Sequence, residues 1–196
     1  EVIAIRVLGS SLDSQGVFDR HLRDIDGTRD KGSLGANAIL GVSLAASYAV
    51  ARSKKIPLYR HLGGGKKLPV PMFNILNGGR HAAKSTDIQE FMVVPLGLPT
   101  FREALRCGAE IYQTLKHTLQ QRGYSTNVGD EGGFAPDMSS NKDALEVILM
   151  SIESAGYIPG KECFIAIDAA ASEFYEAGTY VLPRDGLRLT SGGMVD

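Results

Sequence analysis

The sequence predicts an α/β protein whose first third is mostly helical and whose remainder alternates short strands with amphipathic helices. The change of pattern falls near the glycine-rich segment "HLGGGKKLPVP" at residues 61–71, where we expect a domain boundary. With 196 residues and 43% hydrophobic content, the chain can bury one substantial core, or one domain and part of another. A layered α/β fold or a β/α barrel is therefore expected after the boundary.

The charge balance does not indicate a binding partner for the protein. A formal net charge of −1 provides no long-range field for nucleic acid or an anionic membrane, so an anionic substrate has to be held by local groups. Cys107 and Cys163 lack CxxC spacing and follow no signal peptide, which favours reduced thiols in the cytosol.

Before the boundary, residues 34–51 contain no charged side chain and could be mistaken for a membrane span. Ala, Gly and Ser supply much of this stretch, and Asn37 lies within it, so we expect a helix buried on most sides in a soluble core. Ser33 is placed to cap its start, while Arg52 and Lys54 suit its C-terminal end.

Beyond the boundary, residues 70–76 and 88–94 are short apolar runs that predict two strands of one sheet. Thr100 and Glu103 form a capping box for a helix that ends at Gly123. Its apolar face is expected to hold Leu105, Ile111, Tyr112, Leu115 and Leu119.

A second helix is predicted over residues 141–155, with Gly156 in the stop position. Its expected apolar face consists of Leu145, Ile148, Leu149 and Ile152. The following segment "ECFIAID" predicts a buried strand that ends in Asp168.

Three acids lie beside strand-like segments. In parallel α/β sheets and barrels ligands gather at the carboxyl ends of strands, where Asp168 is expected, while Glu90 begins an apolar run and Glu131 lies in the loop "NVGDEGGFAPD". Taken singly, Asp168 could merely cap the next turn and Glu90 could be an exposed strand end. A shared sheet would instead gather carboxylates that bind a cation or transfer a proton.

The loop at residues 127–137 also places Asp130 and Asp137 around a Gly-Gly pair. We expect Gly132 and Gly133 to let the backbone approach a ligand without obstruction by side chains.

Six long motifs occur in a fixed order along the chain and together closely resemble enolase, the glycolytic phosphopyruvate hydratase. They are "KGSLGANAILGVSLA", "PLYRHLGG", "LPVPMFNILNGGRHA", "QEFMVVPLG", "NVGDEGGFAP" and "DAAASEFY". The ending "GLRLTSGGMVD" is more similar to bacterial members. The resemblance implies the helical part of a small α+β N-terminal domain at residues 1–66, then the first part of an enolase-type TIM-like barrel at residues 67–196.

The resemblance also implies the reaction and its residues. Enolases reversibly dehydrate 2-phosphoglycerate to phosphoenolpyruvate with two Mg²⁺ ions and a lysine base. Glu131 matches the acid that helps hydroxide leave, and Glu90 the carboxylate beside it. Gln89 matches a substrate-binding position, His81 the histidine of the loop over the ligand, and Asp168 one of three acidic metal ligands.

These roles agree with the chemistry of dehydration. A departing hydroxyl needs a proton, and a carboxyl group that is crowded by other acids and partly desolvated can stay protonated near neutral pH. A carbon acid beside a carboxylate loses its proton only if the added negative charge is stabilised. Mg²⁺ held by hard oxygen ligands such as Asp168 stabilises it.

The chain departs from the family pattern in one loop and is short for the fold. Arg80, Ala83 and Lys84 flank His81 where the family commonly carries other residues, and an added cation could alter how the loop closes. Residues 68–196 are too few to close an eight-stranded barrel, which takes about 250 residues. By resemblance, the lysine and two metal ligands lie beyond this sequence, so we expect the chain alone to be an inactive fragment of an active lyase.

Further expectations follow from the resemblance alone. It implies a cytoplasmic homodimer or octamer without a membrane span. Some family members are also found at the cell surface or are secreted. Two other function classes stay open, namely a surface-binding, adhesin-like protein and a non-catalytic paralogue, for which the altered loop at residues 80–84 is the support.

Overall fold

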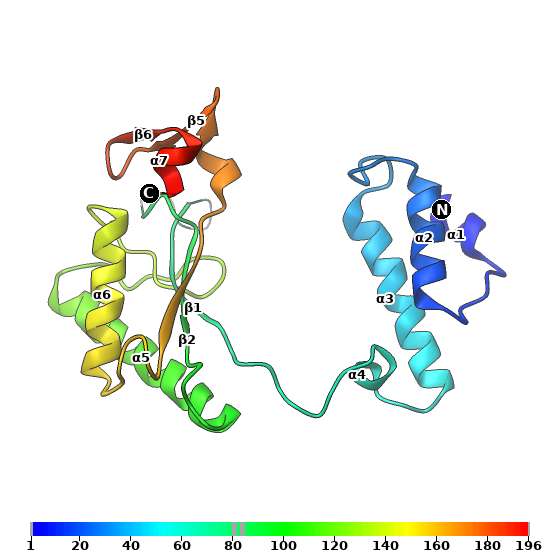
Figure 1. Cartoon of the computed structure of the whole chain (residues 1–196), viewed down its shortest axis with the longest axis horizontal. Helices are drawn as coiled ribbons and strands as arrows, with labels where there is room; N and C mark the ends of the chain where they lie inside the picture. The colour runs from blue at the N-terminus through cyan, green and yellow to red at the C-terminus, as the bar shows by residue number, and fades with distance from the viewer. Residues whose placement is uncertain (1, 80–81, 83–84, 196) are drawn as a thin grey trace. The chain divides into compact units, whose positions relative to one another are not determined.

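The computed structural model of the chain describes residues 2–79, 82 and 85–195. It divides into two compact units, Glu1–Leu68 and Pro69–Asp196, each with its own core (Figure 1). The expectations for the loop at residues 80–84 cannot be compared with the structure, because the described residues do not include Arg80, His81, Ala83 and Lys84.

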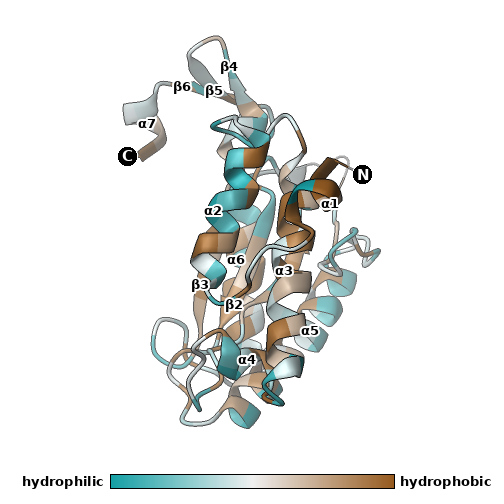
Figure 2. Ribbon diagram, turned by 90° about the vertical axis from the view of Figure 1, so that its right-hand side faces the viewer, coloured by the Kyte–Doolittle hydropathy of each residue, from teal (hydrophilic) through white to brown (hydrophobic). Residues whose placement is uncertain are grey.

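The first unit is helical, as the sequence predicts. Its elements are α1 (Val2–Val7), α2 (Gln15–Asp26), α3 (Ala36–Ser53) and α4 (Leu58–His61). Hydrophilic and hydrophobic residues alternate in patches along α2, as expected for an amphipathic helix (Figure 2). Its apolar side packs on α3 around a small core made of Phe18, Leu22, Ile39 and Ala46.

Polar contacts join α2 to its neighbours. Ser43 Oγ on α3 donates to Asp19 Oδ1 at 2.7 Å. Asp26, at the end of α2, accepts hydrogen bonds from the Thr28 side chain and from the backbone N–H of Leu34, the latter at 2.7 Å. These bonds, led by that of Thr28, hold the pKa of Asp26 below its usual value. Asp26 therefore fixes the connection into α3 as an ionised side chain.

Two expectations for α3 are wrong. The residue before the helix is Gly35 with φ of 88°, a left-handed backbone suited to glycine, so Ser33 does not cap it. The helix is also not buried on most sides, since Leu40, Leu44 and Tyr48 are 58%, 43% and 55% exposed. Apart from Ile39, the buried positions of α3 carry the small residues Ala46, Ser47 and Ala51.

None of the helices in the described part of the chain is long and apolar enough to cross a bilayer. In α3, the small and polar residues keep the hydropathy below that of a spanning segment.

The second unit is built on a three-stranded sheet in the order β1-β2-β3. Its strands are β1 (Phe73–Asn77), β2 (Glu90–Val94) and β3 (Phe164–Asp168). The two runs predicted at residues 70–76 and 88–94 do lie in this one sheet, and both pairs of strands are antiparallel. A register shift between Asn74 and Leu76 places a bulge in β1.

Both strand pairs are antiparallel, unlike the parallel sheets whose carboxyl ends we considered for Asp168. The described strands do not form a closed barrel. The strand "ECFIAID" is also less buried than predicted, because Ile167 is 44% exposed and Asp168 is exposed. β3 is an edge of this sheet in the described residues, so its last residues have a neighbour on one side only.

Helix α5 (Phe101–Gln121) begins as the capping box predicts. Thr100 Oγ1 accepts from the backbone N–H of Glu103 at 3.2 Å and donates to the Glu103 carboxylate at 2.7 Å. The helix ends before Gly123, whose φ is +75°. Leu105 is an exception to the predicted apolar face, since it is 48% exposed.

Helix α6 (Asn141–Ser154) follows the prediction for residues 141–155, with Leu149 40% exposed rather than buried. α5 and α6 pack together and cover one face of the sheet. The core between them includes Ile75, Leu76, Phe91, Val93, Cys107, Ile111, Leu115, Leu119, Met138, Val147, Ile148, Ile152 and Cys163.

The chain then passes through a short helix η2 (Ala171–Phe174) into a small antiparallel meander. Its strands are β4 (Tyr175–Glu176), β5 (Thr179–Leu182) and β6 (Leu187–Leu189), followed by α7 (Ser191–Val195). Figure 1 shows this meander beyond the end of the three-stranded sheet at which β3 finishes.

Candidate active site

One row of polar residues crosses the three-stranded sheet at its end. Asn77, the last residue of β1, pairs with Glu90, the first of β2, and Glu90 pairs with Asp168, the last of β3. Residues directly opposite each other point to the same face of a sheet, with Cβ atoms about 5 Å apart. The antiparallel order therefore brings Glu90 and Asp168 together, although Glu90 begins its strand and Asp168 ends one.

Glu131 approaches the same face from the glycine-rich loop. Asn74 Nδ2 donates to Glu131 Oε2 at 3.0 Å. Asn74 pairs with Met92, two residues along β2 from Glu90, so Asn74 and Glu90 share a face. The bulge in β1 makes this possible, because without it Asn74 and Asn77 would point to opposite faces. The three predicted acids thus lie on or above one face of the sheet.

Asn77 is a residue of this row that sequence reasoning missed. It is 0% exposed, and neither Oδ1 nor Nδ2 of its side chain has a hydrogen-bond partner among the described residues. A buried amide without partners costs about 1–3 kcal/mol and usually serves a ligand, an ordered water or catalysis. The only available signal was its place inside "FNILNGG", just before the loop.

The glycine-rich loop is held against β1 by backbone hydrogen bonds. Phe134 N–H donates to Ile75 O at 2.9 Å, and Asn77 N–H donates to Phe134 O at 2.8 Å. A Cβ on Gly133 would lie 2.3 Å from Asn77 Oδ1. The close approach that requires glycine here is thus to β1 of the protein itself, rather than to a ligand as we expected for Gly133.

Helix α5 supports the loop from its other side. Tyr112 stacks on Phe134 with ring centroids 4.4 Å apart, and its hydroxyl donates to Gly132 O at 2.8 Å. Desolvation raises the pKa of Tyr112, which keeps the hydroxyl protonated as a donor. The core therefore holds the backbone on either side of Gly133, next to the position of Glu131.

Asp168 also does what the simpler interpretation predicts, since its Oδ1 accepts from the backbone N–H of Ala170 at 2.9 Å. That bond caps the turn into η2 and orients the carboxylate. Asp137 does not join the other acids, because it pairs with Arg184 at 2.7 Å. Gln89 is half-buried, and its backbone carbonyl accepts from Gly78 N–H at 2.8 Å across the base of the loop.

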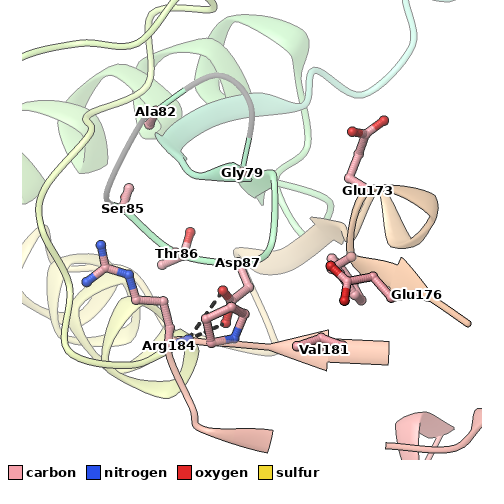
Figure 3. Close-up of a pocket in the computed structure, with 11 residues that line it drawn as sticks. Gly79, Ala82, Ser85, Thr86, Asp87, Glu173, Glu176, Val181 and Arg184 are labelled. Carbon is pink, nitrogen blue, oxygen red and sulfur yellow. Dashed lines mark hydrogen bonds between the residues drawn. The ribbon is translucent and has the colours of Figure 1, made fainter. Parts of the chain in front are cut away.

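A cavity of about 430 Å³ lies between the loop that precedes β2 and the meander (Figure 3). Asp87, Glu173, Glu176 and Arg184 line it. Figure 3 shows the Asp87 carboxylate directed toward the backbone N–H of Arg184. Glu90, Glu131 and Asp168 are not among the lining residues, so this cavity is distinct from the face that gathers the predicted acids.

The carboxylates of Glu90 and Asp168 suit a hard divalent cation in kind, because Mg²⁺ prefers oxygen ligands. They do not suffice in number. Within residues 2–79, 82 and 85–195, no group of three or more His, Cys, Asp or Glu side chains is placed to hold a metal ion.

Comparison with known families covers nearly the whole chain. Residues 1–62 match the family described as "Enolase, N-terminal domain", and residues 65–191 match "Enolase, C-terminal TIM barrel domain". The second match alone spans more than half of the sequence and contains Asn77, Glu90, Glu131 and Asp168. The family to which this chain belongs is therefore that of the enolases.

Proposed function

We propose that this chain supplies the proton-donating side of an enolase active site, which interconverts 2-phosphoglycerate and phosphoenolpyruvate. The observation that carries the proposal is that Glu90 and Asp168 are opposite each other on the face of the sheet from which Asn74 binds Glu131. Family membership supports the same reaction, a hydro-lyase that works with Mg²⁺.

Glu131 is the residue we assign to proton transfer. Loss of water from 2-phosphoglycerate requires a proton at the departing hydroxyl, and a positioned carboxylic acid supplies it. Asn74 Nδ2 holds one oxygen of Glu131 at 3.0 Å, which fixes the direction of the carboxyl group. Glu90, half-buried in the adjacent row, is placed to act beside it.

Asp168 is the residue we assign to the metal. Bound Mg²⁺ would stabilise the negative charge that develops when the substrate loses a proton from carbon. Asp168 contributes one carboxylate, oriented by the Ala170 N–H. The assignments of Gln89 and His81 to substrate binding rest on the resemblance, and His81 lies outside the described residues.

The proposal has two parts that need separate tests. The first is that the isolated chain is inactive, because it supplies too few acidic ligands for the metal. Purified chain, incubated with 2-phosphoglycerate and Mg²⁺, should form no phosphoenolpyruvate in a coupled assay. Magnesium-dependent turnover that persists after repeated chromatography would refute this part.

The second part is tested by transplanting residues 65–191 into an active enolase in place of the matching segment. The chimera should turn over, and Glu131→Gln should lower kcat by about 100-fold or more, as expected for loss of a general acid. Glu153→Gln, at an exposed position on α6, is the matched control and should leave kcat unchanged. A folded chimera without turnover would favour the non-catalytic paralogue instead.

A further inference from the structure

The turn between β5 and β6 contacts the glycine-rich loop through one side chain. Arg184 Nη1 lies 2.7 Å from Asp137 Oδ1 and donates to the backbone carbonyl of Met138 at 3.0 Å. The Arg184 side chain is 27% exposed, whereas that of Asp137 is 70% exposed. An exposed ion pair alone stabilises little, but the added bond to a carbonyl beside the buried Met138 side chain fixes the guanidinium at the end of this loop.

The same residue contacts the loop that precedes β2. The backbone N–H of Arg184 donates to both carboxylate oxygens of Asp87, at 3.1 and 3.3 Å (Figure 3). Asp87 lies two positions before Gln89 and three before Glu90. Arg184 therefore connects two loops, one through its side chain and the other through its backbone.

Asn141 completes the connection at the start of α6. It is 6% exposed, and its Oδ1 accepts from the backbone N–H groups of Asp87 and Ile88 at 2.9 and 3.3 Å. Its Nδ2 donates to Asp87 Oδ2 at 2.9 Å and to Asp185 Oδ2 at 2.6 Å. The backbone N–H of Asn141 donates to Asp185 Oδ1 at 3.0 Å.

This network consists of Asp87, Asp137, Asn141, Arg184 and Asp185. It contains three carboxylates and one guanidinium, so backbone and amide N–H donors provide much of what stabilises the negative charge. Networks of this kind hold their members in one arrangement, because a buried charged group that loses its donors is strongly disfavoured. We therefore expect the two loops and the meander to move together.

We propose that Arg184 is a positioning residue, which holds the segment carrying Glu131 in register with the segment carrying Gln89 and Glu90. The role of Glu131 in catalysis rests on the proposed function above, whereas the coupling between the loops does not. Asp137 lies six positions after Glu131 in the same loop. The loop has two attachments, namely the contacts of residues 132–134 with β1 and Tyr112 and the ion pair of Asp137 with Arg184. Release of Asp137 removes the second attachment and should therefore loosen the contact between Glu131 and Asn74.

The Asn74 side-chain amide is a direct reporter of this coupling, since its Nδ2 donates to Glu131 Oε2. In ¹⁵N-labelled full chain, Arg184→Met should shift or broaden the Asn74 side-chain NH₂ signal. Hydrogen exchange at amides of residues 127–138 should become about tenfold faster, whereas residues 85–90 should change less, because the backbone N–H of residue 184 still donates to Asp87. Arg184→Lys, which retains a cation near Asp137, should restore part of the native signal.

Two controls separate positioning from general destabilisation. Arg188→Met removes a neighbouring guanidinium that donates to Thr179 Oγ1 at 2.9 Å within the meander, and it should leave the Asn74 signal in place. Leu182→Ala removes a buried side chain of β5 and destabilises the meander without touching either loop contact. It should lower thermal stability while the Asn74 signal keeps its native position.

The proposal is overturned if Arg184→Met leaves the Asn74 signal and the exchange of residues 127–138 native, or if Leu182→Ala changes the signal as much. Neither measurement depends on turnover. Failure of the chimera to catalyse the reaction and failure of this coupling are therefore distinguishable.

Discussion

Glu90 on β2 and Asp168 on β3 are direct partners across an antiparallel sheet, so two carboxylates share one face at the same end. Like charges placed opposite each other destabilise a sheet unless a cation or a shared proton intervenes. Asn77 stands on the other side of Glu90 in the same row, with an amide that has no partner among the described residues. The row therefore places two carboxylates and a buried amide on one face, which suits a site that binds a charged ligand.

This pairing predicts the effect of neutralising Asp168. Asp168→Asn retains an oxygen for the Ala170 N–H and removes the repulsion, so it should raise the free energy of unfolding by about 0.5 kcal/mol in EDTA at neutral pH. Urea denaturation measures the change, with Glu153→Gln as the control. A loss of stability in Asp168→Asn would contradict the repulsive pairing.

Gly133 should tolerate no side chain. In Gly133→Ala the new Cβ would approach Asn77 Oδ1 to 2.3 Å and the backbone nitrogen of Leu76 to 3.0 Å, so the loop has to leave β1. We expect a loss of about 2 kcal/mol in thermal or urea unfolding. Gly192→Ala is the control, since its Cβ meets nothing closer than 3.9 Å, and should cost no stability.

Removing the N-cap of α5 should cost a typical capping energy. Thr100→Ala removes the acceptor for the Glu103 N–H and should lower the free energy of unfolding by about 1 kcal/mol. Thr100→Ser keeps the hydroxyl and should recover most of the loss. Equal effects of the two substitutions would show that packing of the Thr methyl group, rather than the cap, stabilises this end.

Cys107 and Cys163 should be free but inert thiols in the folded protein. Both are 0% exposed, and burial, followed by the influence of Cys163, raises the pKa of Cys107 to about 12. Iodoacetamide at pH 8 should therefore label neither residue until the chain is unfolded, when both should react without a reductant. Labelling of the folded chain at the unfolded rate would refute this.

The same thiol predicts how stability depends on alkaline pH. Because the pKa of Cys107 is raised from 9.0 to about 12, its contribution to stability is fully present below pH 9.0. It is lost as the pH rises toward 12, because the thiol of the unfolded chain loses its proton in this range while the thiol of the folded chain keeps it. Cys107→Ala should flatten this decline in unfolding experiments between pH 8 and 11.

The sequence by itself determined the local elements of this protein. Contacts between residues three or four positions apart determine the Thr100 cap, the end of α5 before Gly123 and the span of α6. The local sequence contains both partners of each such contact, so it is sufficient to predict them. The motifs likewise indicated the family and the acids Glu90, Glu131 and Asp168. Leu105 and Leu149 are exposed, which shows that helical periodicity predicts the buried face of a helix but not which residues at its margin are buried.

The tertiary structure decided which of these residues meet. Contact between Asn74 and Glu131 spans 57 positions, and that between Asp87 and Arg184 spans 97. No local pattern encodes the antiparallel order of β2 and β3, the bulge that turns Asn74 toward the acids, or the burial of Asn77. These depend on how separate segments share one core, because the free energy of a nonlocal contact arises only once both segments are in place.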